Sequence, residues 1–461
     1  MKKYFGDKKF YKMVLGVAIP IVIQFGISNF VNLLDNIMVG RLGTEQMTGV
    51  SVVNQLMFVF NLALFGAISG PGIFTAQYAG QKNDEGVRHT LRFKLIVSLL
   101  IGVAGVLVFI FFKENLIMLF LHDNNSGIDL ARTLFHAKEY LFVMLFGLIP
   151  FGVTWSYAGT LRECGETNLP MVAGIVAIGV NLVFNYILIF GHFGAPKLGV
   201  VGAAVATVLS RYVELLIVVI WTHVHKERAA YGVGLYKHFF SIPFPLVKKI
   251  ITMGLPLALN EFLWSMGMSA LTQCYSMRGL DVVAAFNISN TIVNLFNVVL
   301  ISMGNVVSII IGQQLGAGDT EEVVDTDRKL IVVGVLASTA MALILIAFAP
   351  LFPKFYNTTE DIKKLSVELM RIAAIYMPIS SYLNCAYFTI RSGGKTFITF
   401  LFDSAFLWVI CWPVAFVISR YTGINIIGLY VIVLSLDIIK VTIGAILLKK
   451  RIWINNIVNE I

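Results

Sequence analysis

Apolar stretches of about 20 residues recur along the whole chain and are separated by short polar segments. Each stretch matches the length of an α-helix that crosses a bilayer core, and none shows the short alternating segments of a membrane β-barrel. The pattern therefore predicts an all-α membrane protein with about twelve transmembrane helices. The expected spans are 13–38, 48–80, 92–112, 134–160, 168–191, 200–222, 249–276, 283–315, 329–350, 366–390, 396–420 and 425–448.

The same pattern contains an internal duplication. The segment 20–87 aligns without a gap on 256–323, which pairs Pro20 with Pro256, and both copies close on the motif Q-x-x-G-x-x-[ND]-x-E-x-V. A looser echo follows, in which R-S-G-G-K-T at 391–396 matches R-E-C-G-E-T at 162–167. We therefore expect two related six-helix lobes. Their expected bounds are 1–220 for the N-terminal lobe, 221–248 for a cytoplasmic linker and 249–461 for the C-terminal lobe.

Composition and charge agree with a membrane location. The chain is 57% hydrophobic and 13% charged, whereas soluble domains are about 25% charged. The net charge of +9 comes from Lys and Arg that gather in the termini and even-numbered loops, so we expect both termini in the cytoplasm. These basic residues indicate attraction to the lipid of the inner leaflet, not to nucleic acid. The clusters are Lys2, Lys3, Lys8, Lys9 and Lys12, then Lys82, Arg88, Arg92 and Lys94, then the linker, and finally Lys449, Lys450 and Arg451.

Several classes of chemistry lack their motifs. The basic N-terminus leads into a full-length span without a signal-peptidase site, and the four cysteines have neither disulfide nor zinc spacing. The S-G-G-K-T stretch is not a phosphate loop, because Thr389 stands where the first glycine is required. We therefore expect no enzyme activity, no cofactor and no resident metal, and any transport has to use an ion gradient.

The first span carries polar side chains on one helical face. Gln24, Ser28, Asn32 and Asp35 are spaced at i, i+4, i+8 and i+11. A charged residue at the bilayer centre costs at least about 2.5 kcal/mol, so it faces a bundle or a wet cavity and is a functional candidate. We expect Asp35 to take up and release an ion, with Gln24 and Asn32 in a substrate cleft. The alternative is that Asp35 only ties its helix to a neighbour.

Amides form similar stripes in other spans. Asn54 in the second span has a counterpart in Asn290 of the eighth, which also carries Asn294, and the fifth span holds Asn181 and Asn185. Such amides either join helices or line an aqueous path. Two further pairs, Arg211 with Glu214 and Asp437 with Lys440, are spaced as structural ion pairs.

The seventh span contains the acid Glu261 one turn before Trp264. A carboxylate beside an aromatic ring attracts cationic groups. We therefore expect Glu261 to bind cations or to couple ions, and Trp264 to line the cleft. The alternative is that Glu261 is paired within its own lobe.

These motifs resemble the multidrug and toxic compound extrusion (MATE) family of antiporters over nearly the whole chain. The resemblance is carried by V-N-L-L-D-N-I-M-V-G-R-L-G around Asp35, Q-Y-A-G-Q after the second span, the run from Asn181 to Gly191, and G-V-V-G-A-A-V-A-T before Thr207. It implies two six-helix lobes around a central cleft and export of organic cations in exchange for H+ or Na+. By position, it assigns Asp35, Asn181 and the neighbouring Thr207 to the ion site of the N-terminal lobe. The chain departs from many relatives at Asn185, where they carry an acid followed by proline, and this leaves Asp35 as the lone acid there.

The expected function is thus an ion-coupled antiporter in the cytoplasmic membrane, which exports drugs or other toxic compounds by alternating access. Asp35, Asn181, Asn185, Thr207 and Glu261 are the expected coupling residues, and a Na+ ion, if used, should lie near Asp35 and Asn181. The expected partners are cationic or aromatic small molecules, H+ or Na+, and membrane lipid, and the resemblance favours a monomer. The alternatives are a lipid-linked saccharide flippase of the same superfamily and a polytopic membrane enzyme.

Overall fold

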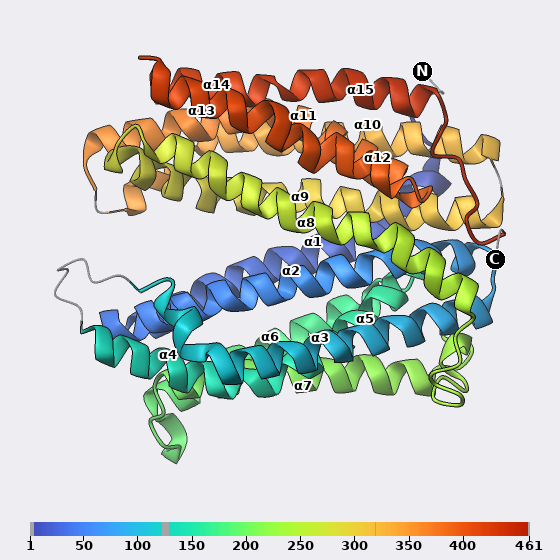
Figure 1. Ribbon diagram of the computed structural model, residues 1–461, viewed down its shortest axis with the longest axis horizontal. Helices are drawn as coiled ribbons and strands as arrows, with labels where there is room; N and C mark the ends of the chain where they lie inside the picture. The colour runs from blue at the N-terminus through green and yellow to red at the C-terminus, as the bar shows by residue number, and fades with distance from the viewer. Residues whose placement is uncertain (1–3, 122–128, 319, 357, 460–461) are drawn as a thin grey trace. The chain divides into compact units, whose positions relative to one another are not determined.

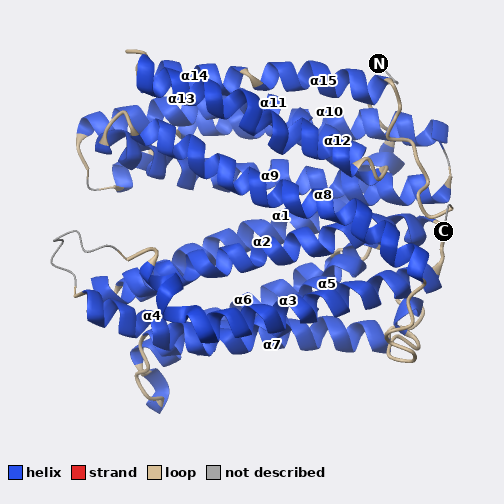
Figure 2. Ribbon diagram, viewed as in Figure 1, coloured by secondary structure: helices blue, strands red, loops and turns tan. Residues whose placement is uncertain are grey.

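The computed structural model describes residues 4–121, 129–318, 320–356 and 358–459, with the side chains of Asn32, Leu33, Asn36 and Leu280 left undescribed. Within these ranges the chain forms helices joined by turns and loops, and contains no β-strand (Figure 2). The α-helices are α1 (Lys8–Gly40), α2 (Thr44–Gly80), α3 (Asp84–Met118), α4 (Leu130–Met144), α5 (Leu148–Glu163), α6 (Asn168–Phe190), α7 (Val200–Val224), α8 (Phe244–Ser276), α9 (Leu280–Ala317), α10 (Thr320–Phe348), α11 (Glu360–Ser392), α12 (Thr396–Phe400), α13 (Trp412–Tyr421), α14 (Ile426–Ser435) and α15 (Asp437–Lys449) (Figure 1). Short 3-10 turns are η1 (Leu145–Gly147), η2 (His192–Gly194), η3 (Ala230–Gly232) and η4 (Phe352–Phe355), whereas η5 (Leu401–Ala405) and η6 (Leu407–Cys411) are π-helical.

These elements form the twelve predicted spans. Ten of the described helical stretches are long and apolar enough to cross a membrane, and α8 and α11, each 33 residues long, complete the set. Three spans are composite: α4 to α5, α12 to α13, and α14 to α15. The fold class predicted from hydropathy is therefore confirmed.

The duplication is visible in the helix bounds. In the alignment that pairs Pro20 with Pro256, α8 begins and ends at the same aligned positions as α1. The starts of α9 and α10 likewise align with those of α2 and α3. The later helices keep the same order, with a slightly smaller difference in residue number between the two copies, so that α12 corresponds to α6 and α14 corresponds to α7. The two halves of the sequence therefore encode the same succession of six spans.

The helices group into two compact units that do not coincide with simple halves of the sequence. One unit contains 23–75 and 83–248, and the other contains 1–22, 76–82 and 249–461. We call them the N-unit and the C-unit. The start of α1 and the end of α2 thus belong to the C-unit, where Phe10, Val14 and Ile21 of α1 join the buried cluster formed with α9 and α10.

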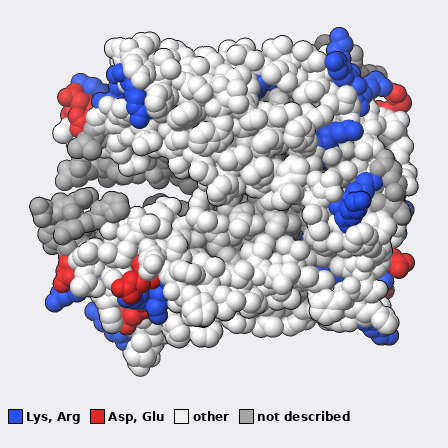
Figure 3. Space-filling view, in the orientation of Figure 1, with Lys and Arg blue, Asp and Glu red and all other residues white. Residues whose placement is uncertain are grey.

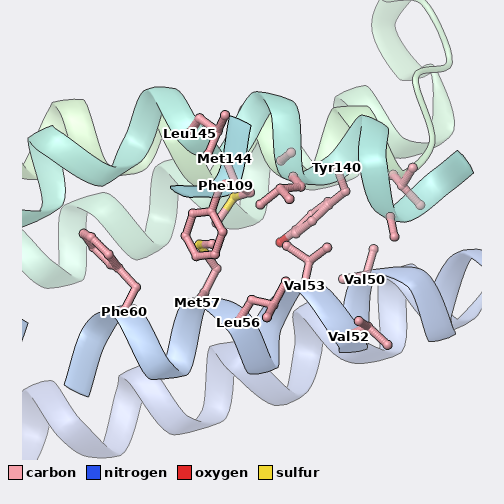
Figure 4. Packing of buried hydrophobic residues seen from close by; sticks show 14 of the residues in the cluster. Val50, Val52, Val53, Leu56, Met57, Phe60, Phe109, Tyr140, Met144 and Leu145 are labelled. Carbon is pink, nitrogen blue, oxygen red and sulfur yellow. The ribbon is translucent and has the colours of Figure 1, made fainter. Parts of the chain in front are cut away.

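The N-unit is held by a large buried apolar cluster (Figure 4). Val53 and Met57 of α2 pack against Phe109 of α3 and against Tyr140 and Met144 of α4. α7 packs on α6, α5 and α4, and α3 packs on α5. The rings and branched side chains fix the faces of these helices, and the polar groups described below are placed by that packing.

In the C-unit, the closing motif of the duplication meets its own copy. A Cβ placed on Gly80 would lie 1.8 Å from the carbonyl oxygen of Gln313, and one on Gly316 would lie 1.9 Å from that of Gln77. The ends of α2 and α9 thus cross with backbone against backbone, which only glycine permits. The motif repeats because each copy supplies half of this crossing.

The C-terminal segment 450–459 covers this crossing. The side chain of Gln77, which is fully buried, donates to the carbonyl oxygens of Ser392 (2.9 Å) and Asn455 (3.1 Å). Its Oε1 accepts from the backbone N–H of Ile457 at 2.9 Å, and Asn456 donates to the Gly316 carbonyl at 3.0 Å. Gln77 therefore has its hydrogen-bonding groups satisfied by the end of α11 and by the segment 450–459.

Two of the basic residues expected on the inner surface are buried in the N-unit, so that part of the prediction was wrong. Arg92, 6% exposed, donates to the carbonyl oxygens of Gly234, Leu235 and Lys237 at 2.6 to 2.9 Å, and so clamps the linker to α3. Lys94 is fully buried and is paired with Glu163 and, at 3.1 Å, with Thr160. Both residues lie inside α3 because this helix begins at Asp84, two turns before the predicted span.

The surface has the charge distribution of a membrane protein. On the visible face of each unit, most Lys, Arg, Asp and Glu side chains lie near the helix ends, and the middle of the helices is largely uncharged (Figure 3). Large apolar side chains such as Leu100, Phe142 and Leu336 are exposed in these middle regions. Such a band is suited to contact with lipid chains.

Candidate functional site

The candidate ion site in the N-unit is built around Asp35 of α1. The carboxylate oxygen Oδ1 of Asp35 accepts a hydrogen bond of 2.7 Å from Nδ2 of Asn185, which comes from α6. Asn181, one turn earlier on α6, also lies against Asp35, and both asparagines are buried, at 5% and 1% exposure. The partners that the described residues supply to Asp35 are therefore amides and not cations.

The amide of Asn181 fits the site in two orientations. With its nitrogen toward Asp35, it lies 3.0 and 3.1 Å from the two carboxylate oxygens, and its oxygen is 3.3 Å from Oγ1 of Thr207. With its oxygen toward Asp35, the amide accepts from Asn185 at 3.1 Å and donates to Thr207 at 3.3 Å. The first orientation suits a carboxylate and the second suits a carboxylic acid, because only the acid donates a proton to the facing oxygen.

Tyr140 of α4 extends this network and was not predicted. Its hydroxyl lies 3.5 Å from Oδ1 of Asn54 on α2 and interacts with the side chain of Thr207. Figure 4 shows the Tyr140 hydroxyl directed at α2, within the apolar cluster. Thus Asn54, Thr207, Asn181 and Asn185 reach Asp35 through one chain of polar contacts, and nothing in the sequence around position 140 distinguishes this tyrosine.

Gln24 belongs to a different cluster in the same unit. Its Oε1 accepts from Nη2 of Arg162 at 3.0 Å, and the Glu214 carboxylate interacts with both Arg162 and Arg211. Arg211 also donates to the Gly147 carbonyl at 3.3 Å and stacks on the ring of Phe151. The predicted proximity of Arg211 and Glu214 is present, but Glu214 is shared with Arg162.

In the C-unit, Glu261 of α8 lies close to other charged groups. Arg391 of α11 and Asp403 both act on it electrostatically, with opposite signs. Trp264, in contrast, is 40% exposed. The cation-binding role of this pair stays a prediction.

The prediction from the sequence did not include a second polar cluster beside Glu261. Asn260 of α8, 1% exposed, donates from Nδ2 to the hydroxyl of Tyr387 and to Oδ2 of Asp403, both at 3.2 Å. Oδ1 of Asp403 lies 3.5 Å from Nζ of Lys440 on α15, and the predicted pair of Lys440 with Asp437 is confirmed at 4.0 Å.

The π-helical segment η5 brings Asp403 to this position. The backbone N–H of Ser404 donates to Oδ1 of Asn260 at 3.2 Å, and the hydroxyl of Ser404 donates to the backbone carbonyl of Asn260 at 2.7 Å. A side chain that enters the hydrogen-bond ladder in this way is a known cause of π-helical turns, which are frequent at functional sites. The sequence offers no signal for the π-helical turn, but Asp403 is an acid inside the predicted span 396–420, and the criterion applied to Asp35 could have identified it.

The amides of α9 form an exposed stripe. Asn287, Asn290 and Asn294 are exposed, together with Thr291, whose hydroxyl donates to the backbone of Asn287. Unpaired amides are costly against lipid, so this face of the helix is suited to water or substrate. The cleft role of Asn290 and Asn294 stays a prediction, and the side chain of Asn32, also a predicted cleft residue, is outside the described part of the chain.

Comparisons with known proteins agree with this architecture. The MatE family model matches residues 20–187 and again 256–417, and the two matches begin at the duplicated prolines. "Probable multidrug resistance protein NorM" of Thermotoga maritima is 25% identical over 445 residues, which cover 96% of this chain and 93% of that protein. "Multidrug resistance protein MdtK" of Yersinia pseudotuberculosis is 26% identical over 376 residues, 82% of this chain and 80% of that protein.

Solved structures share the fold. The structure described as the outward-facing conformation of a multidrug resistance MATE family transporter of the MOP superfamily superposes with a TM-score of 0.84. It is 22% identical, and the match covers 98% of this chain and 97% of that one. A MOP superfamily transporter from Pyrococcus furiosus, whose description reports a binding pocket of reverse polarity, gives a TM-score of 0.83 at 22% identity, with 98% and 97% of the two chains covered. Because the family model matches both halves, the chain belongs to the MatE family of multi-pass membrane transporters.

Proposed function

We propose that this chain is an ion-coupled antiporter that exports drugs or other toxic compounds, organic cations above all, across the cytoplasmic membrane. The family membership and the multidrug resistance proteins among its relatives support the substrate class. Alternating access to the two sides of the membrane would exchange the substrate for H+ or Na+. Both termini and the linker 221–248 would lie in the cytoplasm.

The observation that carries the proposal is the surroundings of Asp35. This carboxylate sits in a membrane span with amide partners instead of a cation. A carboxylate withdrawn from water without a compensating charge binds a proton or a cation more readily. The two orientations of the Asn181 amide give each state of Asp35 a hydrogen-bonded partner, so the site is able to hold the acid and the carboxylate in turn.

A Na+ ion also has candidate ligands here. Oδ1 of Asn185 is buried and has no hydrogen-bond partner among the described residues. Together with the carboxylate of Asp35 and the oxygen of Thr207, it would supply the oxygen ligands that a hard cation prefers. H+ and Na+ would therefore compete for one site.

The test replaces Asp35 by Asn, which keeps the shape and removes the exchangeable charge. A ligand shifts the balance between two access states only by its differential affinity for them. Asp35→Asn should therefore lose gradient-driven export while equilibrium binding of a cationic dye stays close to that of the unmodified protein. Efflux from proteoliposomes, driven by a pH gradient or by a Na+ gradient, identifies the coupling ion in the same assay.

Asp327→Asn is the matched control. Asp327 of α10 is also a buried acid, 4% exposed, and its Oδ1 accepts a hydrogen bond from the Thr389 hydroxyl. An amide keeps an oxygen for that bond, so this variant should export like the unmodified protein. Full gradient-driven export by Asp35→Asn would refute the proposal.

A further inference from the structure

Asp403 has a partner that Asp35 lacks. One oxygen of Asp403 accepts from Asn260 at 3.2 Å, and the other lies 3.5 Å from the ammonium group of Lys440. The side chains of Asp403 and Lys440 are 22% and 14% exposed. Both oxygens of this carboxylate are thus engaged, one by an amide and one by a cation that is part of the chain.

Lys440 is surrounded by two aromatic rings and two carboxylates. Its Nζ lies 5.5 and 5.7 Å from the ring centres of Phe402 and Phe406, and 4.0 Å from Asp437. A lysine at this depth is costly unless it is paired. The ring faces and the two carboxylates provide that pairing, and the π-helical turn sets Phe402, Asp403 and Phe406 around the ammonium group.

Other charged groups around Asp403 are also compensated from within the C-unit. Glu261 and Arg391 act on each other, and Tyr387 lies between Arg391 and Asn260. The remaining titratable neighbours are Asp437, on the far side of Lys440, and the Cys411 thiol. Asp403 and Asp437 thus each lie within 4.0 Å of the Lys440 ammonium group, and Glu261 is influenced by the positive charge of Arg391.

The duplicated positions in the N-unit carry the opposite charges. When the start of α14 at Ile426 is aligned with the start of α7 at Val200, Lys440 corresponds to Glu214 and Asp437 to Arg211. There Glu214 lies between Arg162 and Arg211, and Glu163 is paired with Lys94. Each unit thus neutralises this cluster by itself, and in the N-unit Asp35 stands outside the compensated groups.

We propose that Lys440 is a tethered counter-ion for Asp403, which keeps the acid cluster of the C-unit from requiring a proton or Na+. Lys440 is a positioning residue in this scheme: it acts on Asp403 and does not contact the transported compound. The inference rests on the proposed function for its transport consequence, namely that cation exchange takes place at Asp35. Its structural consequence, the neutralisation of Asp403, is independent of transport.

The test removes the tethered charge with Lys440→Met, which keeps most of the side-chain volume. Asp403 is then an unpaired acid beside Asn260 and has to acquire a proton or Na+. In detergent, the variant should melt several degrees below the unmodified protein at pH 8 without Na+, and acidification or added Na+ should recover most of the loss. The melting temperature of the unmodified protein should respond much less to either change.

Three further variants make the result decisive. Lys440→Met combined with Asp403→Asn should remove the added response to pH and Na+ and should export like the unmodified protein. Lys440→Arg should behave like the unmodified protein, because it keeps the cation. Lys363→Met, which breaks the exposed ion pair with Glu360 at the start of α11, should change neither property.

Two outcomes would overturn the inference. One is a Lys440→Met protein whose melting temperature depends on pH and Na+ as in the unmodified protein. The other is a double variant whose melting temperature depends on pH and Na+ as strongly as that of Lys440→Met. If Lys440→Met does not fold, the double variant alone decides, since it has to fold and to lack the added cation response. Because melting does not require transport, failure of the proposed function leaves this readout intact and is recognised by the absence of dye efflux in the unmodified protein.

Discussion

The crossing of α2 and α9 makes a quantitative prediction for Gly80→Ala and Gly316→Ala. Each new Cβ would lie 1.8 or 1.9 Å from a backbone oxygen, whereas real Cβ atoms keep at least 3.0 Å. The two backbones would therefore have to separate by more than 1 Å, because no side chain can rotate to make room. Overpacking of this kind costs about 2 kcal/mol.

The same separation would stretch the hydrogen bonds of Gln77. It makes three of them, to Ser392, Asn455 and Ile457, at 2.9 to 3.1 Å. At about 1 kcal/mol for each bond, partial loss adds about 2 kcal/mol, which brings the expected destabilisation to about 4 kcal/mol. With about 2 °C per kcal/mol for a large chain, the melting temperature should fall by roughly 8 °C.

The assay is thermal unfolding of the purified protein in detergent, followed by the fluorescence of its six tryptophans. The matched control is Gly179→Ala in α6, where a new Cβ would meet nothing within 4 Å. Alanine is the better helix former, so this variant should melt at the same temperature or slightly higher. If Gly80→Ala and Gly316→Ala melted like Gly179→Ala, the close crossing would not exist in the folded protein.

Two other predictions concern topology and the acid of α8. A cysteine placed at the exposed Lys237 of the linker should be labelled by a membrane-impermeant reagent only in inverted or opened vesicles. A cysteine at the exposed Lys197, between α6 and α7, should instead be labelled from outside intact cells. Labelling of Lys237→Cys from outside would contradict a cytoplasmic linker. Glu261→Gln should reduce efflux of cationic dyes several-fold more than that of neutral ones, if the carboxylate next to Trp264 recognises positive charge; equal losses for both dye classes would assign Glu261 to coupling or to structure.

The spans and the duplication could be predicted because they depend on local pattern. Hydropathy marks a helix wherever about 20 apolar residues follow one another, and the repeated Pro, Gln and Gly positions fix the register between the two copies. The face of α1 that carries Asp35 was also predictable, since few polar residues interrupt that span. The structure adds that Asn181 and Asn185 of α6 supply its partners.

The partners of the remaining site residues could not be predicted, because these contacts join segments that are distant in the sequence. Lys94 looks like a loop residue in sequence, but its partner Glu163 lies 69 residues away. Asp403 faces Lys440 only because Asn260, 143 residues earlier, takes up the backbone N–H of Ser404 and supports the π-helical turn. Tyr140 lies in α4, whose orientation is set by the packing in Figure 4.

The contacts of Gln77 have a consequence for the order in which the protein folds during its synthesis. Its side chain enters the membrane with the second span, yet two of its three hydrogen bonds are made by Asn455 and Ile457, which are synthesised after α15. Domains generally fold from the N-terminus during synthesis, but the C-unit contains 1–22 and 76–82 as well as 249–461. The C-terminal end of α2 therefore has to wait, with a polar side chain unsatisfied, until residues 455–457 have been synthesised. A protein truncated after α15 would keep every membrane span and still lack the segment that finishes the assembly.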